Sequence, residues 1–136
     1  MATSVRDAIW ETLTADATLV GYLGDDNGVY HRTAPQEATF PFVLFHKQAG
    51  HPEWTFGDHH NDELWTIKAV DNHASADVAE AIYAHIEDAL HDAPLEVDGY
   101  GLIYCRREID VDYGEHEEGI VIHHIGAQYR IMLVDL

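Results

Sequence analysis

Basic residues are scarce in this sequence. Lys and Arg together number 7 against 25 Asp and Glu, which gives a formal net charge of −18 at pH 7, and the only lysines are Lys47 and Lys68. Because nucleic-acid binding needs clustered cations that displace counterions, this composition disfavours a protein that binds DNA or RNA by itself. Three explanations of the charge stay open: solubility, adaptation to high salt, which the shortage of lysine favours, or a surface past which a polyanion slides without sticking.

Side chains for nucleophilic catalysis are also few. Cys105 is the only cysteine, so no internal disulfide forms, and its strand-like surroundings predict a small buried apolar residue. The only serines, Ser4 and Ser75, stand where helices begin, and no GxSxG motif occurs. The glycines do not have the spacing of a phosphate-binding loop. We therefore expect a protein that is not an enzyme and that binds no cofactor.

The 11 histidines raise the question of a metal site. His59-His60 and His123-His124 are adjacent pairs, and neighbours in a strand point to opposite faces, so each pair offers one ligand per face. Neither a CxxC nor an HExxH motif occurs. We interpret the histidines as surface polar groups that replace lysine, and expect no metal ligands. A small histidine-rich, metal-dependent enzyme is the less favoured alternative.

Long apolar runs are absent as well. None approaches the ~18–20 residues that span a bilayer, and residues 1–7 lack the apolar segment of a secretory signal. The length of 136 residues suits one domain with one core, and the chain contains no linker or internal repeat. We expect a single domain over residues 1–136 that makes no membrane contact.

The stretch at residues 28–45 organises the rest of the chain. It begins as a short strand, crosses the surface through Ala34-Pro35-Gln36, and enters the apolar run Phe42–Phe45 after Pro41. Proline lacks an N–H group and suits the start of a strand. Because both faces of the apolar run are hydrophobic, we expect this strand to lie well inside a sheet. The polar crossing supplies two candidate partner-interface residues, Pro35 and Gln36.

Hydrophobic periodicity predicts the other elements. Val5, Ile9 and Leu13 share one face of an N-terminal helix, and residues 75–91 form the best amphipathic helix. Alternation predicts further strands over residues 63–70, 102–113 and 120–134. These elements predict an α+β fold, with a mostly antiparallel four- to five-stranded sheet and with the long helix and the N-terminal helix packed on one of its faces.

Two predicted loops carry further candidate contact residues. Residues 50–62 form a polar loop that contains Trp54 and Phe56, and aromatic side chains in such a loop either return to the core or anchor a partner. Residues 114–119 form an acidic hairpin loop. Simple alternation along the strand before this loop places three more acids on one face: Glu108, Asp110 and Asp112.

Several short segments occur in a distinctive order: residues 13–19 (LTADATL), 28–30 (GVY), 34–38 (APQEA), 40–45 (FPFVLF), 65–69 (WTIKA), 79–82 (AEAI) and Arg106-Arg107. In this order and spacing they resemble the tail completion, or tail terminator, proteins of siphovirus-type long-tailed viruses, which join the tail to the head. The resemblance covers nearly the whole chain. The net charge, the histidines and the tryptophan-containing region of residues 54–65 depart from the family pattern.

The resemblance implies a structural virion protein, made in the host cytoplasm, that forms a ring, usually of six copies, at the head-proximal end of the tail tube. Such a ring ends tube polymerisation and binds the tail tube protein and the head connector, while DNA passes through its bore without specific binding. An acidic lining would avoid retaining phosphates, so we hypothesise that the bore is lined by some of Glu108, Asp110, Asp112, Glu115, Glu117 and Glu118. The alternative is a tube-capping module of a phage-derived contractile or secretion apparatus.

Overall fold

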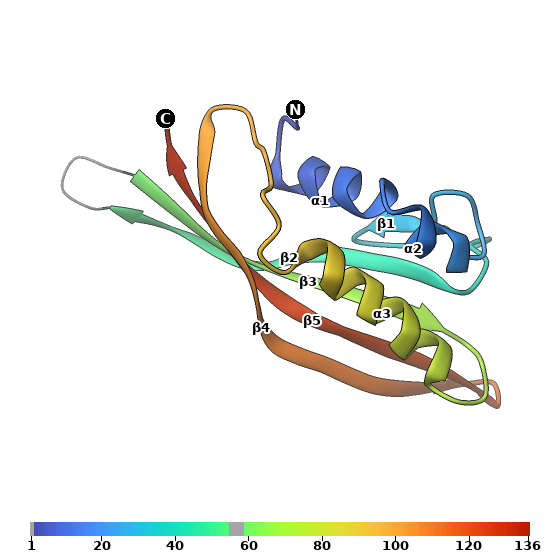
Figure 1. Cartoon of the computed structure of the whole chain (residues 1–136). Coiled ribbons are helices and arrows are strands. Elements are labelled where there is room, and N and C mark those ends of the chain that lie inside the picture. Colours follow the sequence, from blue (N-terminus) through green and yellow to red (C-terminus); the bar gives the residue numbers. More distant parts are fainter. Residues whose placement is uncertain (1, 55–58) are drawn as a thin grey trace.

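The structure is a computed structural model, and it describes residues 2–54 and 59–136 (Figure 1). None of the helices in these residues is both long and apolar enough to cross a membrane. In chain order the elements are α1 (Val5–Thr14), α2 (Ala17–Tyr22), β1 (Val29–His31), β2 (Phe42–Trp54), β3 (His59–Asp71), α3 (Asp77–Leu90), β4 (Tyr100–Glu117) and β5 (Ile120–Asp135).

A five-stranded sheet forms the centre of the molecule, with the strand order β1-β2-β3-β5-β4. β1 pairs with β2 in parallel, and the other three neighbouring pairs are antiparallel. All three helices lie on the same side of the sheet (Figure 1). The predicted α+β fold, with a mostly antiparallel sheet and helices on one face, is therefore confirmed.

Local side chains determine where the first two helices begin. The Ser4 hydroxyl accepts a hydrogen bond from the backbone N–H of Asp7 at 3.2 Å, which caps α1. The Asp16 carboxylate caps α2 by accepting from the N–H groups of Thr18 and Leu19, both at 3.1 Å. Each cap satisfies N–H groups that have no partner within the helix, and the negative charge of Asp16 also suits the helix dipole.

The core fills the space between the helices and the sheet. Its fully buried side chains come from α1 and α2 (Ile9, Leu13, Leu19), from α3 (Ile82, Ile86, Leu90) and from the strands (Val43, Phe45, Ile67, Tyr129, Ile131). The helix stripes predicted from sequence therefore face the sheet. Phe42, on the other face of β2, is only 8% exposed, which agrees with the prediction that this strand lies inside the sheet.

Two polar groups are accommodated inside this core. The hydroxyls of Tyr83 and Tyr129 hydrogen-bond to each other at 3.1 Å. Cys105 is 1% exposed, and its Sγ donates to the backbone carbonyl of Leu90 at 3.3 Å. Burial raises the pKa of this thiol to about 12, so the thiol stays protonated at neutral pH. The prediction of a small buried residue at Cys105 is confirmed.

The two long hairpins extend further than the sequence predicts. Residues 50–62 were expected to form a loop, yet β2 runs to Trp54 and β3 starts at His59. Residues 114–119 were also expected to form a loop, yet β4 continues to Glu117 and only Glu118 and Gly119 turn, both with positive φ. Both expectations were wrong because these segments consist mostly of polar residues, and a strand without alternating apolar residues resembles a loop in sequence.

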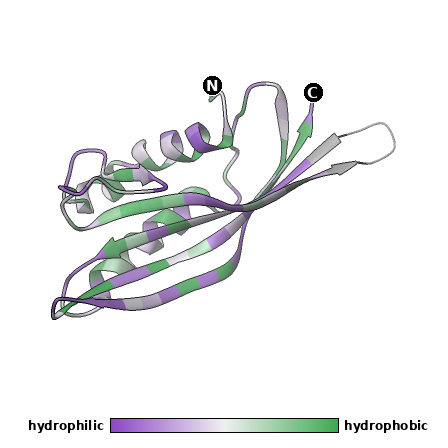
Figure 2. Cartoon of the chain, turned by 180° about the vertical axis from the view of Figure 1, so that it is seen from behind, coloured by the Kyte–Doolittle hydropathy of each residue, from purple (hydrophilic) through white to green (hydrophobic). Residues whose placement is uncertain are grey.

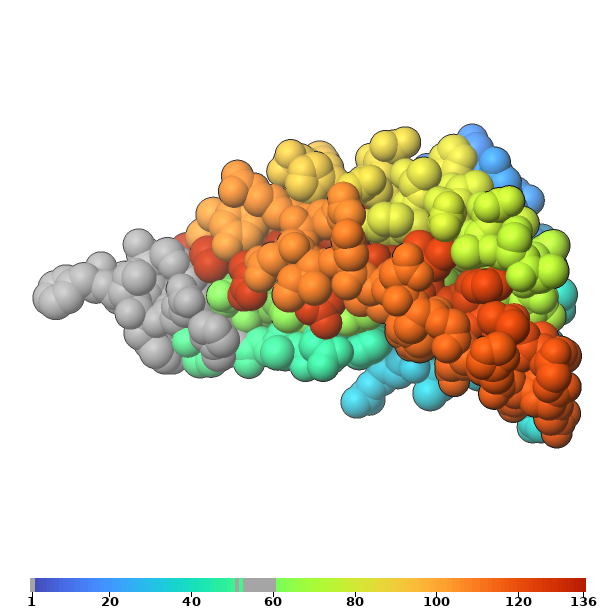
Figure 3. Space-filling model, turned by 90° about the horizontal axis from the view of Figure 1, so that it is seen from below, coloured from blue at the N-terminus to red at the C-terminus, as the bar shows by residue number. Residues whose placement is uncertain are grey.

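No helix of the described residues covers the far side of the sheet. Figure 2 views this open face, along whose strands hydrophilic and hydrophobic residues alternate. Figure 3 views the molecule along another direction and shows the β4–β5 hairpin, in orange and red, extending to one end of the molecule. The described surface therefore offers three regions for contact with other proteins: the open face, the edge strand β4 and the end of its hairpin.

Candidate functional site

The polar crossing between β1 and β2 is a fixed part of the surface. Pro35 and Gln36 are exposed, and the N–H of Ala38 donates to the carbonyl of Pro35 at 3.0 Å. Farther along, the N–H of Thr39 donates to the Asp25 carboxylate at 2.9 Å. The crossing is thus hydrogen-bonded at both ends while its middle stays accessible, a geometry suited to a contact surface.

Asp25 and Gly24 hold this crossing, and sequence reasoning missed both. The Asp25 carboxylate accepts from Thr39 and from the Tyr30 hydroxyl, and the backbone hydrogen bond from Thr39 is the main cause that lowers the pKa of Asp25. A Cβ atom on Gly24 would lie 2.6 Å from the carbonyl oxygens of Thr39 and Phe40. The crossing therefore packs directly on a glycine backbone.

The two aromatic candidates have different outcomes. Trp54 is the last residue of β2 and pairs with His59 of β3, so it lies at the end of a strand, where a loop had been predicted. Phe56 lies outside the described residues. That Trp54 and Phe56 contact a partner therefore stays a prediction.

The acidic candidates on β4 divide between the two faces of the sheet. Asp110 and Asp112 lie opposite the buried Ala127 and Ile125, on the helix-covered side. A β-bulge between Arg107 and Ile109 shifts the register. Glu108 at this bulge reaches Arg130, on the open face. The prediction that Glu108, Asp110 and Asp112 share one face was therefore wrong, because the extra residue of a bulge reverses the alternation that follows it.

The open face carries a charged cluster at this bulge. Arg130 donates to Asp62 at 2.6 Å, and to Glu108 at 2.6 Å through Nε and 2.8 Å through a terminal nitrogen. The bidentate pair with Arg130 is the main cause that lowers the pKa of Glu108. Since Glu108 is already neutralised by an arginine of its own chain, its charge contributes less to any acidic lining than a free carboxylate would.

A second cluster lies near the end of the β4–β5 hairpin. The ring of Tyr113 stacks on the ring of His124 at 4.5 Å between centroids, and the buried ammonium of Lys68 donates to the Tyr113 hydroxyl at 2.8 Å. The Glu115 carboxylate contacts Nε2 of His124. Burial, followed by the charge of Lys68, lowers the pKa of His124 despite this carboxylate. These contacts join the open faces of β3, β4 and β5 as far as Glu115.

Beyond Glu115 the hairpin is a simple exposed ribbon. Glu117 and Glu118 are exposed, and within the described part of the chain neither forms an ion pair. Ile120, which follows the turn, is 51% exposed. The hairpin end therefore presents two free carboxylates beside one apolar side chain.

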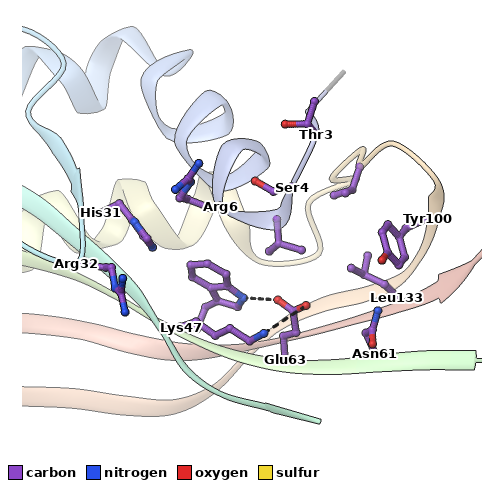
Figure 4. A pocket seen from close by; sticks show the side chains of 13 residues that line it. Thr3, Ser4, Arg6, His31, Arg32, Lys47, Asn61, Glu63, Tyr100 and Leu133 are labelled. Atoms are coloured by element: carbon purple, nitrogen blue, oxygen red, sulfur yellow. Dashed lines mark hydrogen bonds and ion pairs between the residues drawn. The ribbon is translucent and has the colours of Figure 1, made fainter. Parts of the chain in front are cut away.

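A pocket of about 600 Å³ opens beside the N-terminus of α1. Figure 4 shows Arg6, His31, Arg32 and Lys47 on one side of the pocket, facing Tyr100 and Leu133 on the other. Trp65 forms part of the lining and donates from Nε1 to the Glu63 carboxylate at 2.8 Å. No sequence motif indicated this site, because its residues come from α1, from all five strands and from the segments beside them.

The pocket is electropositive. Three of the seven Lys and Arg residues line it, against one carboxylate, Glu63. Burial is the main cause that lowers the pKa of His31, and the positive charges of Arg6 and Arg32 add to it. In an otherwise strongly acidic protein, this is a place where an anionic group would be attracted.

The histidines that the structure describes do not converge on a metal site. Among the described residues, no group of three or more His, Cys, Asp or Glu side chains is placed to hold a metal ion. His123 and His124 point to opposite faces, as neighbours in a strand do: His123 contacts the carbonyl of His73, while His124 stacks on Tyr113.

Comparisons with known proteins identify the family. The sequence matches the family described as "Tail completion protein gp17" over residues 7–133. No curated protein matches. Among solved structures, a chain described as "Virion of native gene transfer agent (GTA) particle" matches with a TM-score of 0.81 and 17% sequence identity, covering 96% of this chain and 95% of that one.

The family match spans nearly all of the described elements, from α1 to the last residues of β5. The structural match agrees in fold over the same length. The resemblance predicted from short segments is thus confirmed, and the chain belongs to the tail completion protein gp17 family, as a structural protein of a virion tail.

Proposed function

We propose that this protein forms a ring that caps the head-proximal end of the tail tube, ends tube polymerisation and joins the tail to the head connector. The observation that carries the proposal is the family match over residues 7–133, since completing a tail means closing its growing end. The ring is expected to hold six copies and to contact the tube protein on one side and the connector on the other.

The sheet edges support assembly into a closed ring. β4 is an edge strand of 18 residues, whereas the opposite edge strand, β1, has only three. A long unpaired edge favours contact with other chains unless it is protected. On β4 the acids beside the exposed Ile109 and Tyr113 (50% and 45%) protect this edge, which leaves it free to face the bore and not a neighbouring chain. A ring requires a heterologous interface that closes by rotation, and an asymmetric sheet suits this geometry.

We place the edge of β4 toward the bore of the ring. Glu108 and Glu115 project from the open side of this strand, and Asp110 and Asp112 project from the helix-covered side. If the β4 edge points toward the ring axis, the acids on both faces of the sheet lie at the lumen. Repulsion between these acids and DNA phosphates would let the genome pass without being retained.

Particles that lack this protein test the capping role. We expect tails of abnormal length that carry no head, seen by electron microscopy, because nothing would end polymerisation or bind the connector. Normal tails joined to heads would refute the proposal. In complete particles, replacing Asp110 and Asp112 with lysine should slow genome ejection, while the same change at Glu11 and Asp88, exposed on the helices, should not.

A tail-like particle of phage origin is the second candidate setting. The match to a chain of a gene transfer agent particle favours it, although at 17% identity this match carries the fold alone. The genes beside this one separate the candidates: tube, tape-measure and replication genes together indicate a virus, and an isolated set of structural genes indicates a derived particle. The proposed cap is the same in both.

A further inference from the structure

We propose that the acidic end of the β4–β5 hairpin of one copy inserts into the basic pocket beside α1 of the next copy, and that this contact links the subunits head to tail. The inference rests on the proposed ring and names its interface. Its occupant is a second copy of this chain, presenting Glu117, Glu118 and Ile120.

The charge of the pocket contrasts with the rest of the molecule. The pocket lining has a formal charge of +2, from Arg6, Arg32 and Lys47 against Glu63. The whole chain has a formal net charge of −18. Of these three cations, only Lys47 pairs with a carboxylate of the described pocket lining. The four remaining bases lie on the sheet. Lys68 is buried against Tyr113, and Arg106, Arg107 and Arg130 pair with carboxylates of their own chain.

The cations of the pocket are poorly paired. Within the described residues, the Arg32 side chain forms no ion pair. Lys47 lies 3.8 Å from Glu63, and Arg6 lies 3.5 Å from its exposed neighbour Asp7. In Figure 4 the basic side chains form one wall and the side chains of Tyr100 and Leu133 another. The pocket therefore suits a ligand that carries carboxylates on one side and an apolar group on the other.

The hairpin end has this composition and a suitable shape. Glu118 and Gly119 turn with φ of 50° and 81°, the tight two-residue connection of a β-hairpin. The turn therefore presents a narrow ribbon with two unpaired carboxylates, and Ile120 lies next to them. Placing these carboxylates beside Arg6 and Arg32 would neutralise charges that each subunit otherwise leaves exposed. Ion pairs enclosed in a pocket are also screened by salt far less than surface charges.

A subunit cannot fill its own pocket in this way. Leu133 lines the pocket and Ile120 stands at the turn, and both belong to the same strand, β5. Thirteen residues of extended chain span about 44 Å. Figure 1 places the hairpin end and the N-terminal end of α1 far apart along the sheet. Engagement must therefore occur between copies, and because the two surfaces differ, it repeats head to tail in one direction, as the proposed ring requires.

Disulfide trapping in assembled particles tests the contact. One cysteine replaces Arg32 and a second replaces Glu118, in a Cys105→Ser background that removes the single native thiol. We expect a non-reducing ladder of multimers that ends at the closed ring. The matched control pairs Glu118→Cys with Asp88→Cys, an exposed position on α3, and should stay monomeric on the same gel.

A charge exchange tests the cause of the contact. Arg6→Glu/Arg32→Glu and Glu117→Arg/Glu118→Arg should each weaken subunit association about ten-fold or more, and their combination should restore most of it. Melting temperatures show that each variant is folded. Rings that assemble at the tail end without the expected crosslink, or a combination that fails to recover association, would overturn this interface and leave the proposed cap intact. Particles with no copies at the tail end would refute the cap itself.

Discussion

The buried tyrosine pair gives the sharpest test of how the core is held. Tyr83 on α3 and Tyr129 on β5 donate and accept one hydrogen bond at 3.1 Å, and they tie the helix to the centre of the sheet. Replacing either residue with phenylalanine keeps the aromatic side chain and removes one hydroxyl. The other hydroxyl then stays in the core without its partner, which costs about 1 to 3 kcal/mol of unfolding free energy.

The two single variants should differ. Tyr129 is 0% exposed and Tyr83 is 9% exposed. Tyr83→Phe leaves the hydroxyl of the fully buried Tyr129 without its partner and should cost about 2 to 3 kcal/mol, whereas Tyr129→Phe leaves the hydroxyl of the slightly more exposed Tyr83 and should cost about 1 kcal/mol. The double variant has no orphaned group, so its loss should be smaller than that of Tyr83→Phe alone.

Urea unfolding followed by circular dichroism gives the unfolding free energy of the parent, the two single variants and the double variant. The double-mutant cycle of these values gives the coupling free energy between the two hydroxyls. We expect a coupling of about 1 kcal/mol or more, and a melting temperature that falls by about 4 °C for each kcal/mol lost. Strictly additive losses, or a larger loss in Tyr129→Phe than in Tyr83→Phe, would refute the reasoning that one satisfied buried pair joins α3 to β5.

Three further predictions test other parts of the structure. Gly126→Ala should cost about 3 kcal/mol or more because its Cβ would overlap the Ile67 carbonyl, while Gly114→Ala, with 3.6 Å to its nearest neighbour, should change urea stability little. The pKa of the Cys105 thiol is about 12 in the folded protein and 9.0 ordinarily, so the thiol ionises in the unfolded chain first. The free energy of unfolding therefore falls as pH rises above 9, and Cys105→Ser should remove about 1.4 kcal/mol of that loss at pH 10. Pro35→Ala/Gln36→Ala should reduce incorporation into particles more than it lowers the melting temperature, and equal losses would make the crossing merely structural.

Helices and buried strands were predictable because their signals are local. The spacing of Val5, Ile9 and Leu13 places one face of α1 toward the core regardless of what packs there. The apolar run after Pro41 likewise indicates a strand with two covered faces. In each case burial of the element's own residues determines the structure, and the sequence displays that burial directly.

The position of the acids was not predictable in the same way. A bulge depends on how two strands pair, and nothing at Glu108 itself indicates that Arg130 of β5 will hold it on the open face. The pocket was missed for a related reason. Arg6, Arg32 and Lys47 are far apart in the sequence, and only the packing of α1 against the ends of the strands brings them together.

The excess of acid makes a final prediction about salt. An accessible surface of 7474 Å² shared by 18 net charges gives each about 415 Å², or a spacing of about 20 Å. The Debye length is about 30 Å at 0.01 M salt and about 3 Å at 1 M, so the charges repel one another in the first condition and not in the second. We therefore expect the melting temperature to rise with potassium chloride.

The choice of salt separates screening from stronger hydrophobic burial. If screening dominates, potassium chloride and ammonium sulfate should act alike at equal ionic strength, and Glu11→Gln/Asp88→Asn should show a weaker salt dependence than the parent. A much larger effect of sulfate would instead indicate strengthened burial, because sulfate is excluded from protein surfaces. A melting temperature that does not change between 0.01 M and 1 M potassium chloride would rule out charge repulsion as a limit on stability. It would also rule out the hypothesis that the acidic composition is an adaptation to high salt.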